Sequence, residues 1–305
     1  MSSPRHVTEL PPITPEDLAH IVQAGAPQLM PDGSLLYTTT RWEANERRMR
    51  LIKQPTVGEP TMLFDGDLTD PALSRDGKRI AFAGRVNGEA GVAVLEVDSK
   101  AVHLVTKFAG SARAPLWSPD GTRLLVEVLA PTPEAPQDPR VMTRVRYDLD
   151  GLGHLGSRTW NVYVIDVASG NATAIGTPEW HHLYPCWAPD GRRIALITTR
   201  RPDWDIEWVW DLYTVDLESH EWRCLTNSDG VARMPVWSRD GTHIAYFHNH
   251  TPLTSSTYDY HLMAVASDGT DEPRCLSHSF DRGSPQGMVP FRATAPEELG
   301  DGRFI

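Results

Sequence analysis

The sequence contains few cysteines, and their spacing fits no known pairing motif. Its 305 residues include three, Cys186, Cys224 and Cys275, with no close pair and no C-x-x-C spacing. Disulfide-stabilised domains are rich in cysteine, and structural zinc sites place cysteine ligands at short fixed spacings. We therefore expect three buried, reduced thiols, and neither a disulfide framework nor a cysteine-based metal site.

Positive charge is scarce as well. The chain has 29 Lys and Arg residues against 40 Asp and Glu residues, which gives a net charge of −11. A nucleic acid backbone and an anionic membrane surface both attract an excess of Lys and Arg. The charge balance therefore argues against nucleic acid and against a membrane as partners.

Long apolar runs are absent from the sequence. No run reaches the length of about 18 apolar residues that a transmembrane helix needs. Residues 1–10 include Arg5, His6 and Glu9 and lack the apolar segment of a secretory signal. With its unpaired cysteines, the chain is predicted to be cytoplasmic. Apolar residues still make up 40% of it, which is the composition of a globular protein and not of a disordered one.

A repeat organises the chain: a proline is followed, five residues later, by Asp-Gly. The five copies are Pro27–Gly33, Pro71–Gly77, Pro115–Gly121, Pro185–Gly191 and Pro235–Gly241. Asp-Gly favours a tight turn, because glycine accepts a positive φ without steric cost. We therefore expect a turn at each repeat aspartate, namely Asp32, Asp76, Asp120, Asp190 and Asp240.

A β-rich run follows the turn in most copies. Arg79–Phe82, Arg193–Leu196 and His243–Tyr246 alternate apolar residues with others and are predicted as half-buried strands. A second strand pair follows, for example at Asn161–Val167 and Asp211–Leu217. Each unit is thus four short antiparallel strands, which is a propeller blade. Trp117, Trp187 and Trp237 occupy one repeat position, and we expect them to pack between blades.

The predicted fold class is all-β: a β-propeller of four-stranded antiparallel blades, five recognisable, with the start of a sixth. The aspartates of successive copies are 44, 44, 70 and 50 residues apart, whereas a blade needs about 40–50 residues. The long step therefore contains an insert at 130–158, Pro-rich at first and then forming an extra hairpin over 144–156. The predicted repeats cover about 25–66, 67–108, 109–180, 181–228 and 229–278, with a partial one at 279–305.

The two ends depart from the repeat. Residues 1–24 are predicted as an extension with a short helix over 15–23, in which Thr14 is the cap and Asp17 reaches back to it. Leu18, Ile21 and Val22 would form its buried face. At the other end, Asp301-Gly302 resembles the opening of a sixth hairpin that is not completed. An unfinished propeller has bare strand edges, so we expect the isolated chain to self-associate as a homo-oligomer.

These motifs resemble the N-terminal propeller of the prolyl oligopeptidase family, especially its acylaminoacyl-peptidase-like branch. The resemblance rests on the W-S-P-D-G-type repeats, the insert sequence Arg144–Gly151 and the strand Asp211–Leu217. The repeat is shared with TolB-like propellers. In the family, a following α/β-hydrolase domain carries Ser, Asp and His, and the propeller caps its active site and limits substrates to peptides.

The resemblance implies that this chain gates peptide access to a hydrolase domain that it does not contain. No G-x-S-x-G nucleophile motif occurs in the sequence. The segment Gly283–Gly287 contains a serine between two glycines, but its spacing is wrong for this motif. We therefore expect no catalytic residue and no cofactor in this chain, with the hydrolase domain and its peptide substrates as partners. A stand-alone TolB-like binding propeller and a metal-dependent propeller lyase are the two alternatives.

Two groups of residues are candidate binding sites. The resemblance implies that acidic residues on a propeller loop hold the terminal amine of a substrate, and Asp205 and Glu207 lie in such a stretch. The lyase alternative instead needs histidine ligands. Residues two apart share one face of a strand, which selects His248 and His250, and the equivalent region one blade earlier adds His181 and His182.

Overall fold

The computed structural model describes residues 14, 17, 21–43, 46–131, 144–145, 148–149, 153–156, 158–207, 209–250 and 260–278. Within these ranges, twenty strands form five four-stranded antiparallel sheets, and two further strands form a short hairpin. The chain divides into two compact units, residues 1–68 and 69–305. The described residues include no helix long and apolar enough to cross a membrane.

The first unit contains the first sheet, blade I. Its strands pair in chain order and are β1 (Gln23–Leu29), β2 (Leu35–Glu43), β3 (Glu46–Gln54) and β4 (Thr61–Gly66). Leu36 and Leu51, from the two central strands, have no exposed surface, and Leu63 of β4 is also buried.

The helix predicted over 15–23 is wrong at its C-terminal end. Gln23 is the first residue of β1, where it pairs with Thr40 of β2. Ile21 and Val22 are 50% and 57% exposed, so they form no buried face. The capping contact is confirmed, because the Thr14 N–H donates to the Asp17 carboxylate at 2.7 Å. Residues 15, 16 and 18–20 lie outside the described ranges.

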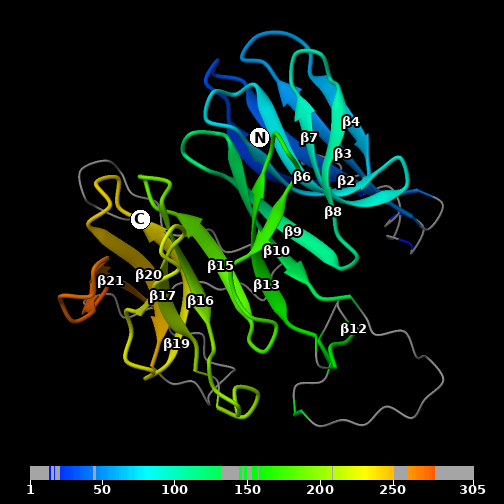
Figure 1. Cartoon of the computed structure of the whole chain (residues 1–305). Helices are drawn as coiled ribbons and strands as arrows, with labels where there is room; N and C mark the ends of the chain where they lie inside the picture. The colour runs from blue at the N-terminus through cyan, green and yellow to red at the C-terminus, as the bar shows by residue number, and fades with distance from the viewer. Residues whose placement is uncertain are drawn as a thin grey trace, which may run out of the picture. The chain divides into compact units, whose positions relative to one another are not determined.

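The second unit contains blades II to V, which follow one another in chain order (Figure 1). Blade II comprises β5 (Leu68–Leu73), β6 (Arg79–Val86), β7 (Glu89–Glu96) and β8 (Val102–Lys107). Blade III comprises β9 (Ser111–Trp117), β10 (Arg123–Leu129), β13 (Trp160–Asp166) and β14 (Ala172–Ala174).

Blades IV and V repeat the same strand order. Blade IV comprises β15 (His182–Trp187), β16 (Arg193–Thr198), β17 (Asp211–Asp216) and β18 (Trp222–Cys224). Blade V comprises β19 (Val231–Trp237), β20 (His243–Asn249), β21 (His261–Ala266) and β22 (Arg274–Cys275). The predicted fold of four-stranded antiparallel blades is therefore confirmed.

The insert in blade III contains the predicted extra hairpin. It lies between β10 and β13, and β11 (Asp148–Leu149) pairs with β12 (Gly153–His154) in an antiparallel sheet. The Pro-rich part of the insert, from residue 132 to residue 143, lies outside the described ranges, as does the predicted sixth blade at 279–305.

The second strand of each blade in the second unit is buried on both faces. In β10, Leu124 and Val126 pack with Ala81 of blade II, while Leu125 packs with Ile194 of blade IV. The expectation of half-buried strands is therefore wrong. β10 lies between the sheets of blades II and IV, and β16 lies between those of blades III and V, so both sets of alternating side chains in these strands are apolar.

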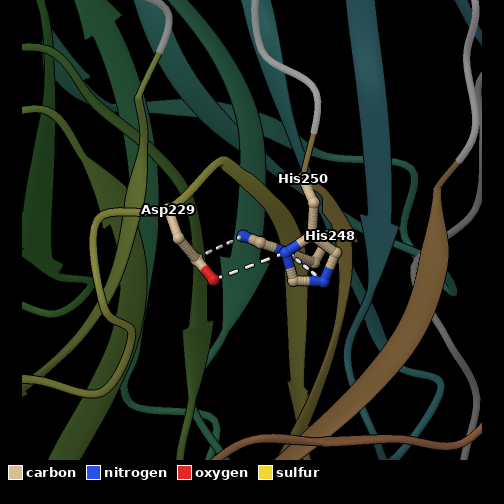
Figure 2. A group of neighbouring side chains, drawn as sticks. All are labelled: Asp229, His248 and His250. Atoms are coloured by element: carbon tan, nitrogen blue, oxygen red, sulfur yellow. Dashed lines mark hydrogen bonds and ion pairs between the residues drawn. The ribbon is translucent and has the colours of Figure 1, made fainter.

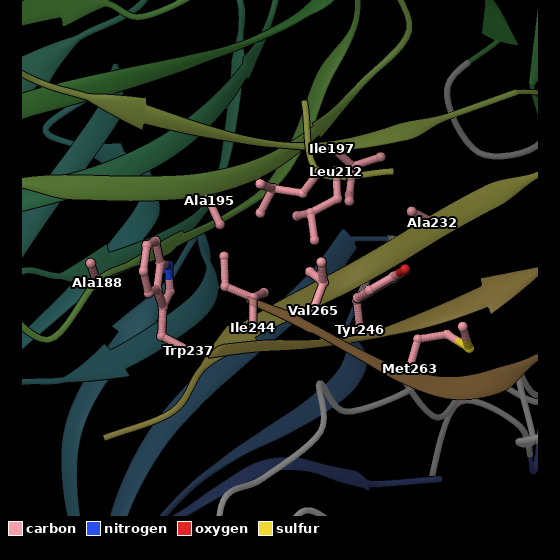
Figure 3. Close-up of a cluster of buried hydrophobic side chains, with 11 residues drawn as sticks. Ala188, Ala195, Ile197, Leu212, Ala232, Trp237, Ile244, Tyr246, Met263 and Val265 are labelled. Carbon is pink, nitrogen blue, oxygen red and sulfur yellow. The ribbon is translucent and has the colours of Figure 1, made fainter. Parts of the chain in front are cut away.

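The same arrangement continues between blades IV and V (Figure 3). Ile197 and Leu212 of blade IV lie opposite Ile244 and Tyr246 of blade V, and all four are at most 1% exposed. Trp237, which is 5% exposed, extends this cluster toward Ala188.

All five repeat aspartates lie at the predicted turns. The glycine that follows each one has a left-handed φ of 67–80°. In blade V the Asp240 carboxylate accepts hydrogen bonds from the Ser238 hydroxyl at 2.6 Å and from the Thr242 N–H at 2.9 Å. These donors, the Ser238 hydroxyl first, lower the pKa of Asp240 to about 2. The aspartate therefore closes the turn in its ionised form.

The repeat proline marks a β-bulge. The residue before it has a left-handed φ in four blades, namely Asp70 (52°), Ala114 (50°), Tyr184 (52°) and Met234 (50°). The register of the first two strands shifts at the same place in blades III, IV and V. Proline cannot donate to a ladder and is found at bulges or edges. The bulge thus explains why a proline recurs inside a strand.

An arginine and a tryptophan join successive blades at these turns. Arg79 of blade II lies 4.5 Å from the ring centroid of Trp117 in blade III and donates to the Gly121 carbonyl at 2.7 Å. The Trp117 indole N–H donates back to the Ala72 carbonyl at 2.9 Å. Cation–π contact and hydrogen bonds therefore act together across the interface.

The cation–π contact recurs at the next two interfaces, and both hydrogen bonds recur at the first of these. Arg123 lies over Trp187 and donates to the Gly191 carbonyl, while the Trp187 indole donates to Leu116. Arg193 lies over Trp237 at 4.9 Å. The Trp237 indole N–H is buried and reaches no acceptor in the described part of the chain, so its contribution comes from packing.

We predict that Trp237→Ala lowers the free energy of unfolding by about 3–5 kcal/mol, because it leaves a large cavity between blades IV and V. Trp42→Ala is the matched control, since Trp42 is 55% exposed and surface changes are worth about 0.5 kcal/mol or less. Urea unfolding followed by circular dichroism measures both. Equal midpoints for the two variants would contradict the packing of Trp237.

We predict that Asp240→Asn lowers stability at neutral pH but not at pH 2. The pKa of Asp240 is lowered to about 2 in the folded chain, whereas an unfolded aspartate titrates at about 3.9. Its stabilisation is therefore complete above about pH 4 and is lost as the pH falls toward 2. The gap in urea midpoint between wild type and variant should close over that range. A gap that does not change with pH would refute the assignment.

Candidate functional site

The loop between β16 and β17 contains Asp205, one of the two predicted amine-binding residues. Asp205 is 5% exposed, and one of its oxygens accepts from the Arg144 guanidinium at 3.0 Å. The other accepts from the Val145 N–H at 2.7 Å. Burial raises the pKa of Asp205, but these hydrogen bonds outweigh it and the pKa is lowered. The carboxylate therefore anchors the insert of blade III to blade IV.

Glu207, the second predicted amine-binding residue, faces solvent. Its side chain is 50% exposed and forms an ion pair with Arg201 of the same loop. An exposed pair of this kind contributes little to stability, because water screens it. Of the two candidates, Glu207 is the one whose carboxylate a ligand can reach.

His181 and His182 lie among the aromatic residues of blade IV. His181 contacts Trp204 at a centroid distance of 4.5 Å, and its Nδ1 accepts from the Trp160 N–H at 3.2 Å. His182 contacts Trp222 at 5.5 Å. Burial lowers the pKa of both histidines to about 4, so both are neutral at pH 7 and pack as aromatic side chains.

His248 and His250 lie together at the end of β20, with Asp229 as a third member of the cluster (Figure 2). His248 Nε2 is 3.3 Å from Asp229 Oδ1, and His250 Nδ1 is 3.4 Å from Asp229 Oδ2. His248 Nδ1 is 3.3 Å from His250 Nε2. Among the described residues this is the one group of three potential metal ligands, and it includes neither His181 nor His182.

Sequence reasoning did not find Asp229. It lies in the loop before β19, two residues ahead of Val231, which pairs with Asn249 of β20. The signal was available in Asp229-Gly230, one of five Asp-Gly pairs outside the proline repeat. The antiparallel pairing of the next strand with His243–Asn249 then places Asp229 next to the two histidines.

All three cysteines are free thiols. Burial raises the pKa of Cys186 to about 12, so this thiol remains protonated and unreactive. The expectation of three buried thiols is wrong: Cys186 and Cys275 are half-buried, and Cys224, on β18, is exposed.

Comparison with known proteins gives the same fold. No family model matches the sequence. An acylaminoacyl peptidase from Pyrococcus horikoshii superposes on 87% of this chain with a TM-score of 0.67 and 19% identity. A TolB-like protein from Agrobacterium tumefaciens superposes on 83% of it with a TM-score of 0.53 and 18% identity. The chain has the propeller fold that these proteins share.

The propeller spans less than half of the peptidases that it resembles. It covers 41% of the acylaminoacyl peptidase chain but 80% of the TolB-like chain. In sequence, it is 25% identical to the uncharacterized peptidase YuxL of Bacillus subtilis (strain 168) in an alignment of 210 positions, which covers 60% of this chain and 31% of YuxL.

We predict that Asp205→Ala destabilises the propeller by about 1–3 kcal/mol, because it leaves the Val145 N–H and Arg144 without their acceptor. Glu207→Ala, two residues away, should change stability by about 0.5 kcal/mol or less, because its ion pair is exposed. Urea unfolding compares the two variants. Similar losses in both would contradict a structural role that is specific to Asp205.

Proposed function

We propose that this chain is the propeller portion of a serine peptidase of the prolyl oligopeptidase type, of the acylaminoacyl-peptidase-like branch. In this proposal it controls the access of peptides to a hydrolase domain outside the 305 residues. The observation that carries it is the superposition on acylaminoacyl peptidase, which covers 87% of this chain and 41% of the other. The sequence match to a second peptidase, YuxL, supports it independently.

The chemistry of the chain supports a non-catalytic role. The sequence contains no G-x-S-x-G motif, the turn on which a hydrolase of this type carries its nucleophilic serine. His181 and His182 have pKa values of about 4 and are buried against aromatic rings. A triad histidine must instead take a proton from a neighbouring serine.

The packing of the blades suits a gate. Because the second strands of blades II to V are covered on both faces, these sheets form a rigid wall in which no single strand can move alone. A rigid wall selects substrates by size, whereas loops on it select by chemistry. Glu207 is exposed on such a loop and remains the candidate for holding a substrate amine, while Asp205 is occupied by Arg144.

Activity of the complete reading frame tests the proposal. We predict that the 305-residue chain does not hydrolyse acylaminoacyl p-nitroanilides, whereas the protein encoded by the complete gene does and is blocked by a fluorophosphonate. The complete protein should cleave short peptides and leave folded proteins intact. Absence of a hydrolase domain from the complete gene would overturn the proposal, as would equal cleavage of peptides and folded proteins.

A stand-alone binding propeller is the second candidate function. The observation in its favour is the match to a TolB-like protein, 80% of which this chain covers. It predicts a gene without a hydrolase domain and a monodisperse chain that binds a protein or ligand. The peptidase proposal instead predicts that the isolated chain self-associates through surfaces that are covered in the complete protein, which size-exclusion chromatography distinguishes.

A further inference from the structure

The contacts between Asp229 and the two histidines, His248 and His250, are longer than ordinary hydrogen bonds. The two contacts between the carboxylate and the imidazoles measure 3.3 and 3.4 Å, beyond the usual N–H···O range of about 2.7–3.2 Å. A tetrahedral ion bound at about 2.0–2.1 Å holds its ligand atoms about 3.3 Å apart. The polar atoms of the three side chains therefore approach one another at the spacing of metal ligands. The contacts involve both carboxylate oxygens and both nitrogens of each ring, so the side chains must rotate to aim one atom each at a common centre.

The chemistry of the three side chains suits a transition metal. Two imidazoles and one carboxylate are ligands that Zn²⁺ commonly takes, whereas Mg²⁺ prefers oxygen ligands alone. One ligand atom from each residue lies within 4.8 Å of the other two. His248 is buried, while Asp229 and His250 are each 50% exposed. The cluster is therefore open to solvent on one side, where an ion can enter and keep a water ligand.

The loop that carries Asp229 is held in position by hydrogen bonds of the preceding residue, Ser228. Asp211, which is 8% exposed, accepts from the Ser228 N–H at 3.0 Å and from the Ser228 hydroxyl at 2.7 Å. Ser228 has a left-handed φ of 55°. These contacts fix the backbone at the residue before Asp229 and do not touch the three side chains of the cluster.

Gly230 allows the close approach of this loop to β20. A Cβ at this position would lie 2.1 Å from the Asn249 carbonyl oxygen and 2.9 Å from His248 Nε2. Any larger residue would therefore push Asp229 away from the two histidines. The glycine and the Asp211–Ser228 contacts together define a built site and not a chance meeting of surface side chains.

We propose that Asp229, His248 and His250 bind one divalent transition metal ion, with Zn²⁺ as the preferred ion. The ion joins the loop before β19 to the end of β20 and so fastens the inner two strands of blade V. A remaining coordination position faces solvent, where water or a carboxylate ligand completes the site. This site is independent of the peptidase proposal, because all its ligands belong to this chain.

Titration of the tag-free, chelator-treated 305-residue chain with ZnCl₂ tests the site. Isothermal calorimetry should give one Zn²⁺ per chain, and the ion should raise the melting temperature because it binds the folded state. MgCl₂ should neither bind nor compete. Absence of saturable one-to-one Zn²⁺ binding would overturn the proposal, and so would displacement of Zn²⁺ by Mg²⁺.

Two variants and a matched control locate the ion. His250→Ala and Asp229→Asn change half-exposed side chains and should weaken Zn²⁺ binding by about tenfold or more. His243→Ala is the control, because His243 is an exposed histidine at the start of the same strand, and it should bind as wild type does. Unchanged affinity in both site variants would overturn the proposal.

Nuclear magnetic resonance of the wild-type chain gives a readout that needs no variant. The imidazole ¹⁵N signals of His248 and His250 should shift on addition of one equivalent of Zn²⁺, while those of His181 and His182 should not. Shifts confined to other histidines would place the ion elsewhere and refute the site.

Discussion

Burial of the second strand on both faces in blades II to V is the constraint on which the second unit depends. In blades II to V the strand after each Asp-Gly turn is buried on both faces, with Ile80, Leu124, Ile194 and Ile244 without exposed surface. A single four-stranded sheet cannot cover both of its own faces. Each blade therefore needs a neighbour, which explains why the sequence repeats at the length of one blade.

Several polar groups form hydrogen bonds that link neighbouring blades and keep this stacking intact. The repeat aspartates close the turns with their own carboxylates, and Arg79 and Arg123 cross to the glycine carbonyl of the next turn. Glu127, buried between blades III and IV, accepts from Arg113 and from the Tyr184 N–H at the bulge of the next blade. Buried polar atoms thus link neighbouring blades and do not interrupt the apolar clusters.

The candidate functional residues lie where chain segments leave this frame. The insert of blade III returns to blade IV through Arg144 and Asp205, and the loop before blade V brings Asp229 to His248 and His250. The first contact joins segments that no strand ladder connects, whereas the second extends the β19–β20 ladder by two residues. In the proposed gate, the frame would exclude large substrates and the loops would present exposed carboxylates such as Glu207.

The sequence by itself determined the blades. The proline, Asp-Gly and tryptophan spacing predicted five blades, their strands and the hairpin in the insert, because turn chemistry and strand alternation are local. Only the tertiary structure decided which faces are buried, that each proline marks a bulge, and that Asp205 is occupied by Arg144. It also divided the four candidate histidines into two separate pairs and added Asp229 to one of them. The physical reason is that these contacts depend on strand register, on neighbouring blades and on the close approach that Gly230 allows, none of which a local pattern encodes.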